Sequence, residues 1–398
     1  MAGPLDGVRV LELSSVVLGP WACQILGDFG ADVIKVEPPG GDSNRQLGPA
    51  RHPGMAALYL TCNRNKRSVV MDLKQPAGRE AALRLARRAD VLVHNYRPGA
   101  LERLGLDYPA VRAINPRIVF CGTYGYSRRG PYRDRAAYDD SIQAAAGLAM
   151  LPTLMGEPPR YLPTIVADKT TGLAVVNAVL AALFHRERTG VGQEIEVPMY
   201  ETMVAYVMAE HLYGCVFDPP EGGAGYTRLL SRQRRPYRTR DGYLAVLPYL
   251  NEHWRVFCEA AGRPDLAADP RFATLALRLQ HIDDVYAETG KVIAERTTAE
   301  WLEILGRTNV PVMLVNTLDD LLTDPHLAAT GFWQRVDHPT EGALRMPGVP
   351  TTFSETPGGV RRLPPRLGEH SREVLAELGY TEEEIAAMVR DGVTRGPQ

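Results

Sequence analysis

One carboxylate stands at the start of a long apolar segment, in the stretch YLPTIVADKTTGLAVVNAVLAALFHRE at residues 161–187. Leucines and valines recur at helical spacing after Asp168, and Gly190 closes the segment, so the pattern predicts a helix that begins near Asp168. Because Asp is a preferred N-cap residue, capping is the structural interpretation of Asp168. The chemical interpretation is a nucleophilic carboxylate that the helix N-terminus keeps ionised beside a cleft. Position alone leaves both interpretations open.

Basic side chains lie in or near the loops at the ends of several predicted strands. A single one of these is usually a solvated surface charge. Together they suit a ligand with several phosphates, because Arg and Lys bind phosphate oxygens through charge-assisted hydrogen bonds. The residues are Arg45, Arg51, Lys66, Arg67, Lys74, Arg97, Arg103 and Arg133.

Several common catalytic signatures are absent from the sequence. The segment SSVVLGPWACQILGDFG after the first predicted strand lacks the glycine spacing of a dinucleotide fingerprint, and no GxxxxGKS/T, HExxH or GxSxG occurs. The five cysteines form no CxxC pair, and His94, His185 and His211 have no metal-ligand spacing. We therefore expect no metal and no permanently bound cofactor.

The composition is that of an average globular protein, with 45% hydrophobic and 23% charged residues in a chain of 398. A formal net charge of -2 gives no support to nucleic acid or an anionic membrane as the partner. The first residues show no secretory pattern, and the apolar run 173–184 is shorter than the roughly 20 residues that span a bilayer. We expect a soluble protein in the reducing cytoplasm.

Strands and helices alternate through the first half of the chain. Residues 8–13 and 31–37 are predicted as strands on either side of a helix that opens at Gly19-Pro20. This order predicts an α/β fold with a doubly wound parallel sheet. We place the large domain at residues 1–210, completed by 345–398, and a smaller α/β domain at 227–325. The Pro- and Gly-containing segment 211–226 is the predicted linker, and residues 326–344 are the predicted return linker.

A series of motifs then adds a resemblance. PLDGVRVLEL, GDFGADVIKVEPPGGD, NRNKRSVVMDLK, NYRPG, GPYRDRAAYD, ADKTTG and RLGEHSREVLAELGY follow one another over nearly the whole chain. In this order they resemble the class III CoA-transferases, the family of formyl-CoA transferase and carnitine CoA-transferase. The resemblance implies transfer of CoA from an acyl-CoA donor to a carboxylic acid, with small dicarboxylates such as succinate expected from family habit. It also implies a homodimer of two interlocked ring-shaped chains.

The same resemblance assigns the site. It makes Asp168 the nucleophile, which forms a mixed aspartyl anhydride and then an aspartyl-CoA thioester. The residues implied to bind the coenzyme are Lys74, Asn95, Tyr96, Arg97, Arg103 and Tyr138. Two departures speak against formyl-CoA and oxalate as the substrate pair. Val17 stands where formyl-CoA transferase has glutamine, and the glycine-rich loop of that enzyme's small domain has no counterpart.

Two other functions compete with CoA transfer. α-Methylacyl-CoA racemases share the fold and the aspartate, but they use a histidine as base where this chain has Tyr138. A tyrosine with a pKa of about 10 suits a base near neutral pH less well than histidine at about 6.5, which favours transfer. The second competitor is a non-catalytic acyl-CoA-binding protein, against which the presence of Asp168 and Gly172 speaks.

A further cluster of arginines follows the predicted linker, between Arg228 and Arg240. A solvated linker face is the simpler interpretation of this cluster. The alternative hypothesis is that one of these arginines pairs with the second carboxylate of a dicarboxylic acceptor.

Overall fold

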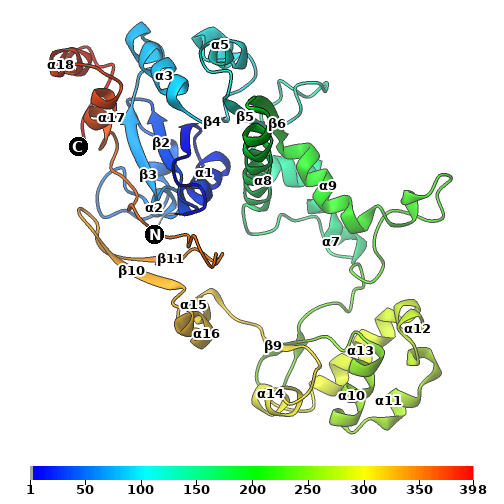
Figure 1. Cartoon of the computed structure of the whole chain (residues 1–398). Helices are drawn as coiled ribbons and strands as arrows, with labels where there is room; N and C mark the ends of the chain where they lie inside the picture. Colours follow the sequence, from blue (N-terminus) through cyan, green and yellow to red (C-terminus); the bar gives the residue numbers. More distant parts are fainter. Residues whose placement is uncertain (1–2, 398) are drawn as a thin grey trace. The chain divides into compact units, whose positions relative to one another are not determined.

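The computed structural model describes residues 3–397. Its chain forms two compact units, coloured along the sequence in Figure 1. Unit 1 takes in the chain up to Gly147, then Tyr161–Tyr206 and the chain from His326 on. Unit 2 takes in Leu148–Arg160 and Val207–Pro325.

Unit 1 is built on a six-stranded parallel sheet with the strand order β3-β2-β1-β4-β5-β6. The order reverses between β1 and β4, and doubly wound sheets form their ligand crevices at such a point. The predicted α/β fold with a parallel sheet is therefore confirmed. The strands are β1 (Arg9–Leu13), β2 (Asp32–Glu37), β3 (Lys66–Val70), β4 (Val91–His94), β5 (Val119–Tyr124) and β6 (Gln193–Pro198).

Helices cover both faces of this sheet (Figure 1). Side chains alternate along each strand, so Leu11 and Ile34 turn to one face and share a buried core with the helices there. Those helices are α3 (Pro76–Arg88), α5 (Tyr108–Ile114), α17 (Ser371–Glu377) and α18 (Glu382–Arg390). The other face packs against α1 (Leu18–Asp28) and α8 (Val166–Thr189), with α2 (Ala57–Cys62) beside α1.

Buried charges lie between α1 and the strands β1, β2 and β3. Glu12, Lys35 and Lys66 are each fully buried. Lys35 Nζ lies 2.9 Å from Glu12 Oε1, and Lys66 Nζ lies 2.8 Å from Glu12 Oε2. Burial raises the pKa of Glu12, but the two ammonium groups lower it by a larger amount. The pKa of Glu12 therefore lies below its usual range. Lys66, which the sequence suggested as a phosphate ligand, is therefore committed to an internal ion pair.

Two arginines from the same sequence-based group are also committed to carboxylates. Arg45 is buried and donates to both carboxylate oxygens of Glu37 at 2.7 Å. Arg67 is buried as well and binds Asp32 and two glutamates of α17. Sequence position placed these side chains near strand ends but gave no information about their burial.

The 24-residue helix α8 is long and apolar enough to cross a membrane by length and composition alone. In the structure it packs against α1, β5 and β6, as the core helix of an α/β unit does. Gly172 permits the close approach to α1, because a Cβ at this position would lie 3.0 Å from Trp21 Cε3 and 3.2 Å from the Leu18 carbonyl oxygen. The sequence-based apolar run covers only the middle of this longer helix.

The returning chain contains a hairpin where the sequence suggested a linker. β10 (Trp333–His338) pairs antiparallel with β11 (Gly342–Pro347), after the short helix α16 (Pro325–Ala329). Polar residues along β10 hide the alternation that would have predicted a strand. The predicted return linker at 326–344 therefore includes β10 and the start of β11.

Unit 2 has its own core and a small antiparallel sheet in the order β7-β8-β9. Large aromatic side chains fill the core, among them Trp254, Phe257 and Trp301. Residues 148–160, predicted in the large domain, cluster with this unit, as does the predicted linker 211–226. The elements are β7 (Tyr237–Arg238), β8 (Tyr243–Val246), β9 (Val312–Leu314), α7 (Leu151–Leu154), α10 (Asn251–Ala261), α11 (Pro264–Ala268), α12 (Leu275–Gln280), α13 (Ile282–Ile293), α14 (Thr298–Leu305) and α15 (Leu318–Leu321).

Candidate active site

A cavity of about 430 Å³ opens at the carboxyl ends of β1, β4, β5 and β6, within unit 1. Its walls are the connections that leave these strands, at the reversal of the strand order. Six of the predicted site residues line it, and they are Asn95, Tyr96, Arg97, Arg103, Tyr138 and Asp168. Lys74 does not line the cavity. It is exposed beyond β3, and its assignment to the coenzyme stays a prediction.

Asp168 lies in the first turn of α8, two residues after the helix begins. Its carboxylate accepts no hydrogen bond from residues 3–397, and the N-cap position belongs to Ile165. The capping interpretation of Asp168 is therefore wrong. Burial first, and then the nearby charge of Asp139, raise the pKa of Asp168 to about 7.

Asp139 caps α8 in place of Asp168. It opens the short helix α6 (Asp139–Ala145) and is buried. Its Oδ2 accepts from the backbone N–H groups of Ala167 and Asp168 at 2.7 and 3.0 Å. Its Oδ1 accepts from Gln143 Nε2 at 2.5 Å. Asp139 was not predicted from the sequence, where its only signal was its place directly after Tyr138.

A second wall is the turn between β1 and α1. Val17 and Leu18 are buried and line the cavity, and their backbone N–H groups have no partner within the described chain. They stand at the N-terminus of α1, where the helix dipole favours negative charge. An oxyanion that forms in the cavity would find these two donors in place.

The turn itself is fixed by side chains on both sides. Asn95 Oδ1 accepts from the Ser15 N–H at 3.0 Å, and Asn95 Nδ2 donates to the Ser15 carbonyl at 2.9 Å. Asn95 therefore ties the connection after β4 to the connection after β1. Its amide is used for this link, so the residue shapes the cavity as well as lining it.

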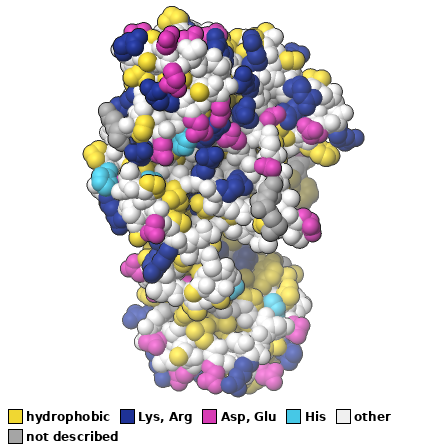
Figure 2. Space-filling view, turned by 60° about the vertical axis from the view of Figure 1, so that its left-hand side comes forward, with side chains coloured by type: hydrophobic (Ala, Val, Ile, Leu, Met, Phe, Trp, Pro, Cys, Tyr) yellow, Lys and Arg dark blue, Asp and Glu magenta, His cyan; other side chains and the backbone are white. Residues whose placement is uncertain are grey.

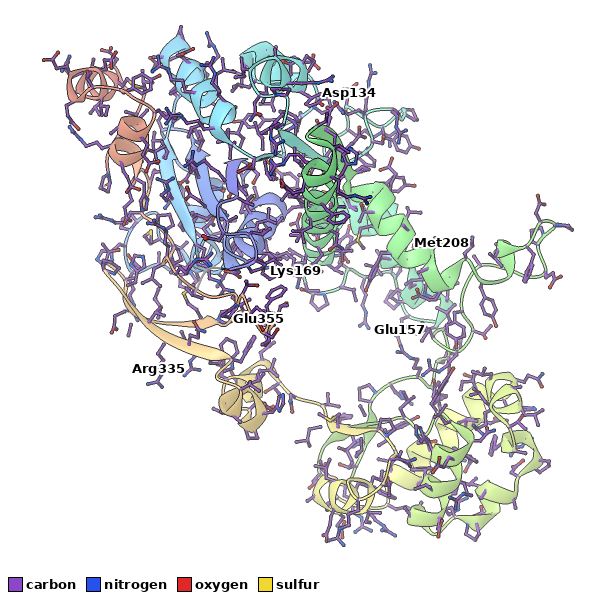
Figure 3. All side chains as sticks on the ribbon, in the orientation of Figure 1. Asp134, Glu157, Lys169, Met208, Arg335 and Glu355 are labelled. Carbon is purple, nitrogen blue, oxygen red and sulfur yellow. The ribbon has the colours of Figure 1, made fainter. Side chains whose placement is uncertain are left out.

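Arginines gather in the part of the cavity formed after β4 and β5. Arg97 and Arg103 belong to the connection after β4, which includes α4 (Ala100–Leu104), and Arg133 and Arg135 belong to the loop after β5. Figure 3 labels Asp134 on this loop and Lys169 next to Asp168, and the two lie well apart. We call Arg97, Arg103, Arg133 and Arg135 the cationic end of the cavity, which the Asp168 carboxylate also lines. Arg135 was missed from the sequence.

Tyr138 is 73% exposed and sits at the N-cap position of α6. Within the described chain no histidine lines the cavity, and His94, which directly precedes the cavity residue Asn95 in sequence, is buried. Burial and the charge of Arg128 lower the pKa of His94 to about 3. The cavity thus offers no imidazole base. Among residues 3–397 no group of three or more His, Cys, Asp and Glu is placed to hold a metal ion.

Comparison with known proteins agrees with the geometry. A profile of "CoA-transferase family III" matches residues 5–371. The chain belongs to this family. The resemblance inferred from the motifs is thereby confirmed, and with it the assignment as a CoA-transferase.

Relatives of known description extend over most of the chain. Succinyl-CoA:glutarate CoA-transferase of Mus musculus is 34% identical over 98% of this chain and 90% of its own length. Succinate–glutarate CoA-transferase of Agrobacterium fabrum is 36% identical over 94% of this chain and 96% of its own length. The crystal structure of Rv3272 from Mycobacterium tuberculosis has a TM-score of 0.80 at 33% identity, covering 93% of this chain and 99% of that one.

Proposed function

We propose that this enzyme transfers CoA between an acyl-CoA and a free carboxylic acid, with Asp168 as the covalent nucleophile. The observation that carries the proposal is the state of that carboxylate. It lines a cavity with a cationic end, accepts no hydrogen bond from the described chain and has a pKa raised to about 7. An ionised carboxylate of raised basicity and low solvation is a better nucleophile than an ordinary one.

The steps balance without any other reactant. An Asp168 oxygen attacks the thioester carbonyl carbon, the C–S bond breaks, and CoA leaves as the thiolate from a mixed anhydride. The thiolate then attacks the aspartyl carbonyl carbon and releases the donor's carboxylate, which leaves an aspartyl-CoA thioester. The acceptor carboxylate reverses the two steps. Each addition places negative charge on a carbonyl oxygen, which the N–H groups of Val17 and Leu18 can receive.

The relatives suggest which acids take part. Several are named for glutarate, malate or citramalate, which are dicarboxylates, together with succinyl-CoA, the CoA thioester of a dicarboxylic acid. We therefore propose dicarboxylic acids as acceptors and their CoA thioesters as donors. The interlocked homodimer, the cytoplasmic location and a role for the Arg228 to Arg240 cluster in acceptor binding stay predictions.

Trapping of the acylated enzyme tests the nucleophile. Wild-type enzyme incubated with acyl-CoA and hydroxylamine should carry a hydroxamate at Asp168, and borohydride should reduce the thioester there. Asp168→Ala should lose CoA exchange while it still binds acyl-CoA, because the cationic end is intact. Asp134→Asn is the matched control, since Asp134 also lines the cavity but already pairs with Arg133 at 3.3 Å.

The alternatives give different results. A racemase would exchange the α-proton of an acyl-CoA with solvent deuterium and show no trapped aspartate. A passive binding protein would show neither reaction. Exchange between thioester and free acid that survives Asp168→Ala would contradict the proposal.

A further inference from the structure

The turn between β1 and α1 contains a valine in an unusual backbone conformation. Val16 has φ = 70°, in the left-handed region that β-branched residues rarely enter. It lines the cavity directly before Val17 and Leu18. Such strain persists only where the surroundings enforce it.

Two buried side chains enforce this conformation. Asp42 Oδ1 accepts from the Val16 N–H at 3.0 Å, and Asn44 Nδ2 donates to the Val16 carbonyl at 2.7 Å. Asp42 is 3% exposed, and Asn44 is fully buried. Together with the two hydrogen bonds between Asn95 and Ser15, they use all four backbone polar groups of Ser15 and Val16. No freedom is left for the turn to relax toward an ordinary valine conformation.

We call Asp42 and Asn44 the clamp, and Asp42 connects it to the sheet. Asp42 Oδ2 lies 2.9 Å from Lys35 Nζ, and the Asp42 N–H donates to Glu37 Oε2 at 3.0 Å. Lys35 in turn pairs with Glu12 of β1. A chain of buried ion pairs thus connects the centre of the sheet with the wall of the cavity.

We propose that Asp42 and Asn44 are positioning residues for the transfer reaction. They hold Val16 in its left-handed conformation, which aims the free N–H groups of Val17 and Leu18 at the carbonyl that Asp168 attacks. This inference rests on the proposed function of Asp168. The two residues touch no substrate; they act through the turn.

Loss of Asp42 or Asn44 should therefore slow the chemical step without weakening coenzyme binding. Coenzyme binding depends on the cationic end, which the clamp does not contact, whereas the oxyanion donors depend on the clamp. A misplacement of about 1 Å at a reacting centre can lower a rate by about 100-fold. Asn44→Ala should therefore lower kcat by roughly 10- to 100-fold and change the KM for acyl-CoA by less than about 3-fold.

Glycine at position 16 provides the decisive comparison, because glycine enters the left-handed region without strain. In a Val16→Gly background the turn needs less enforcement, so the kcat loss caused by Asn44→Ala should shrink several-fold. A purely structural role for Asn44 would give the same loss in both backgrounds. Should Asn44→Ala not fold, Asp42→Asn, which keeps the side-chain shape but loses the charge facing Lys35, is measured in the same two backgrounds.

Asn115→Ala is the matched control. Asn115 Nδ2 also donates to backbone carbonyls, those of Ala86 and Ala89 at 2.9 and 2.7 Å, but it lies outside the cavity. This variant should lower the unfolding temperature without lowering kcat. The inference is overturned if Asn44→Ala behaves like Asn115→Ala, if it changes only KM, or if its kcat loss is equal in both backgrounds. A wild-type enzyme without CoA exchange would instead contradict the proposed function.

Discussion

At the scale of single residues, the site is defined by two neighbouring carboxylates with different tasks. Asp139 accepts the hydrogen bonds at the start of α8, and Asp168 is left without a partner and with its pKa raised. Capping had been one interpretation of Asp168, and the chain does use an aspartate cap at this helix. The cap comes from another helix, which sequence position could not reveal. Burial of Asp168 was equally invisible, because it depends on segments distant in sequence.

The pH dependence of transfer should follow the ionisation of Asp168. Only the carboxylate form attacks, so kcat/KM should rise with pH through a midpoint near about 7. In Asp139→Asn the neighbouring negative charge is gone while burial remains, so the midpoint should move to lower pH. The measurement is a pH profile of kcat/KM for both proteins. Asp140→Asn, which changes an exposed neighbour, should leave the midpoint in place; an unmoved midpoint in Asp139→Asn would contradict the charge argument.

At the scale of elements, the alternation of strands and helices was predictable because buried parallel strands are continuous apolar runs between turns. β1 and β2 begin one residue after the predicted ranges 8–13 and 31–37 and end where those ranges end. The resemblance assigned the cavity's predicted residues, of which Asn95, Tyr96 and Arg97 directly follow β4. Tyr138 and Asp168 instead stand at the starts of helices. Side-chain burial was not predictable in this way: Lys66 and Arg67 belong to the group of basic residues predicted to suit phosphates, yet both are buried in ion pairs. The hairpin β10–β11 was missed because β10 is largely polar and β11 begins with glycine and ends with proline.

The buried ion pairs between β1, β2 and β3 should contribute strongly to stability only as a complete set. Glu12→Gln leaves Lys66 without a carboxylate partner in a fully buried position, and loss of one partner of a buried pair costs about 3–5 kcal/mol. Denaturant unfolding measures this as a change in the free energy of unfolding.

The control is an exposed pair on α3. Glu80→Gln removes the partner of Arg84, and such surface pairs contribute less than about 1 kcal/mol. If the free energy of unfolding fell equally in the two variants, the buried ion pairs would contribute no more to stability than the exposed pair does.

At the scale of the whole molecule, apolar side chains remain exposed on α8, with Leu173 at 49% and Phe184 at 65%. The other face of the helix is buried in unit 1. On the face shown in Figure 2, basic and acidic side chains are interspersed, in line with the net charge of -2. An exposed apolar helix face is complementary to another apolar face, so a second copy of the chain fits it better than a charged partner does.

We predict that the enzyme is a homodimer and that Phe184→Glu shifts it toward monomer, because a charge at an apolar contact is costly to bury. Sedimentation velocity over a range of concentrations measures this. Val389→Glu, on the exposed side of α18, should leave the mass unchanged. A monomeric wild-type protein at all concentrations would contradict the prediction.

The walls of the cavity are mainly four separate connections, each leaving its own strand, and the sheet itself adds only Thr123 and Tyr124 at the end of β5. Such an arrangement lets one wall be exchanged while the rest stays intact. We predict, for example, that shortening the arginine-bearing loop after β5 weakens binding of the phosphates of the coenzyme and leaves Asp168 in place. The kcat/KM for truncated thioesters such as acyl-pantetheines would then come closer to that for acyl-CoA. This loop is therefore a starting point for engineering transfer onto simpler carriers.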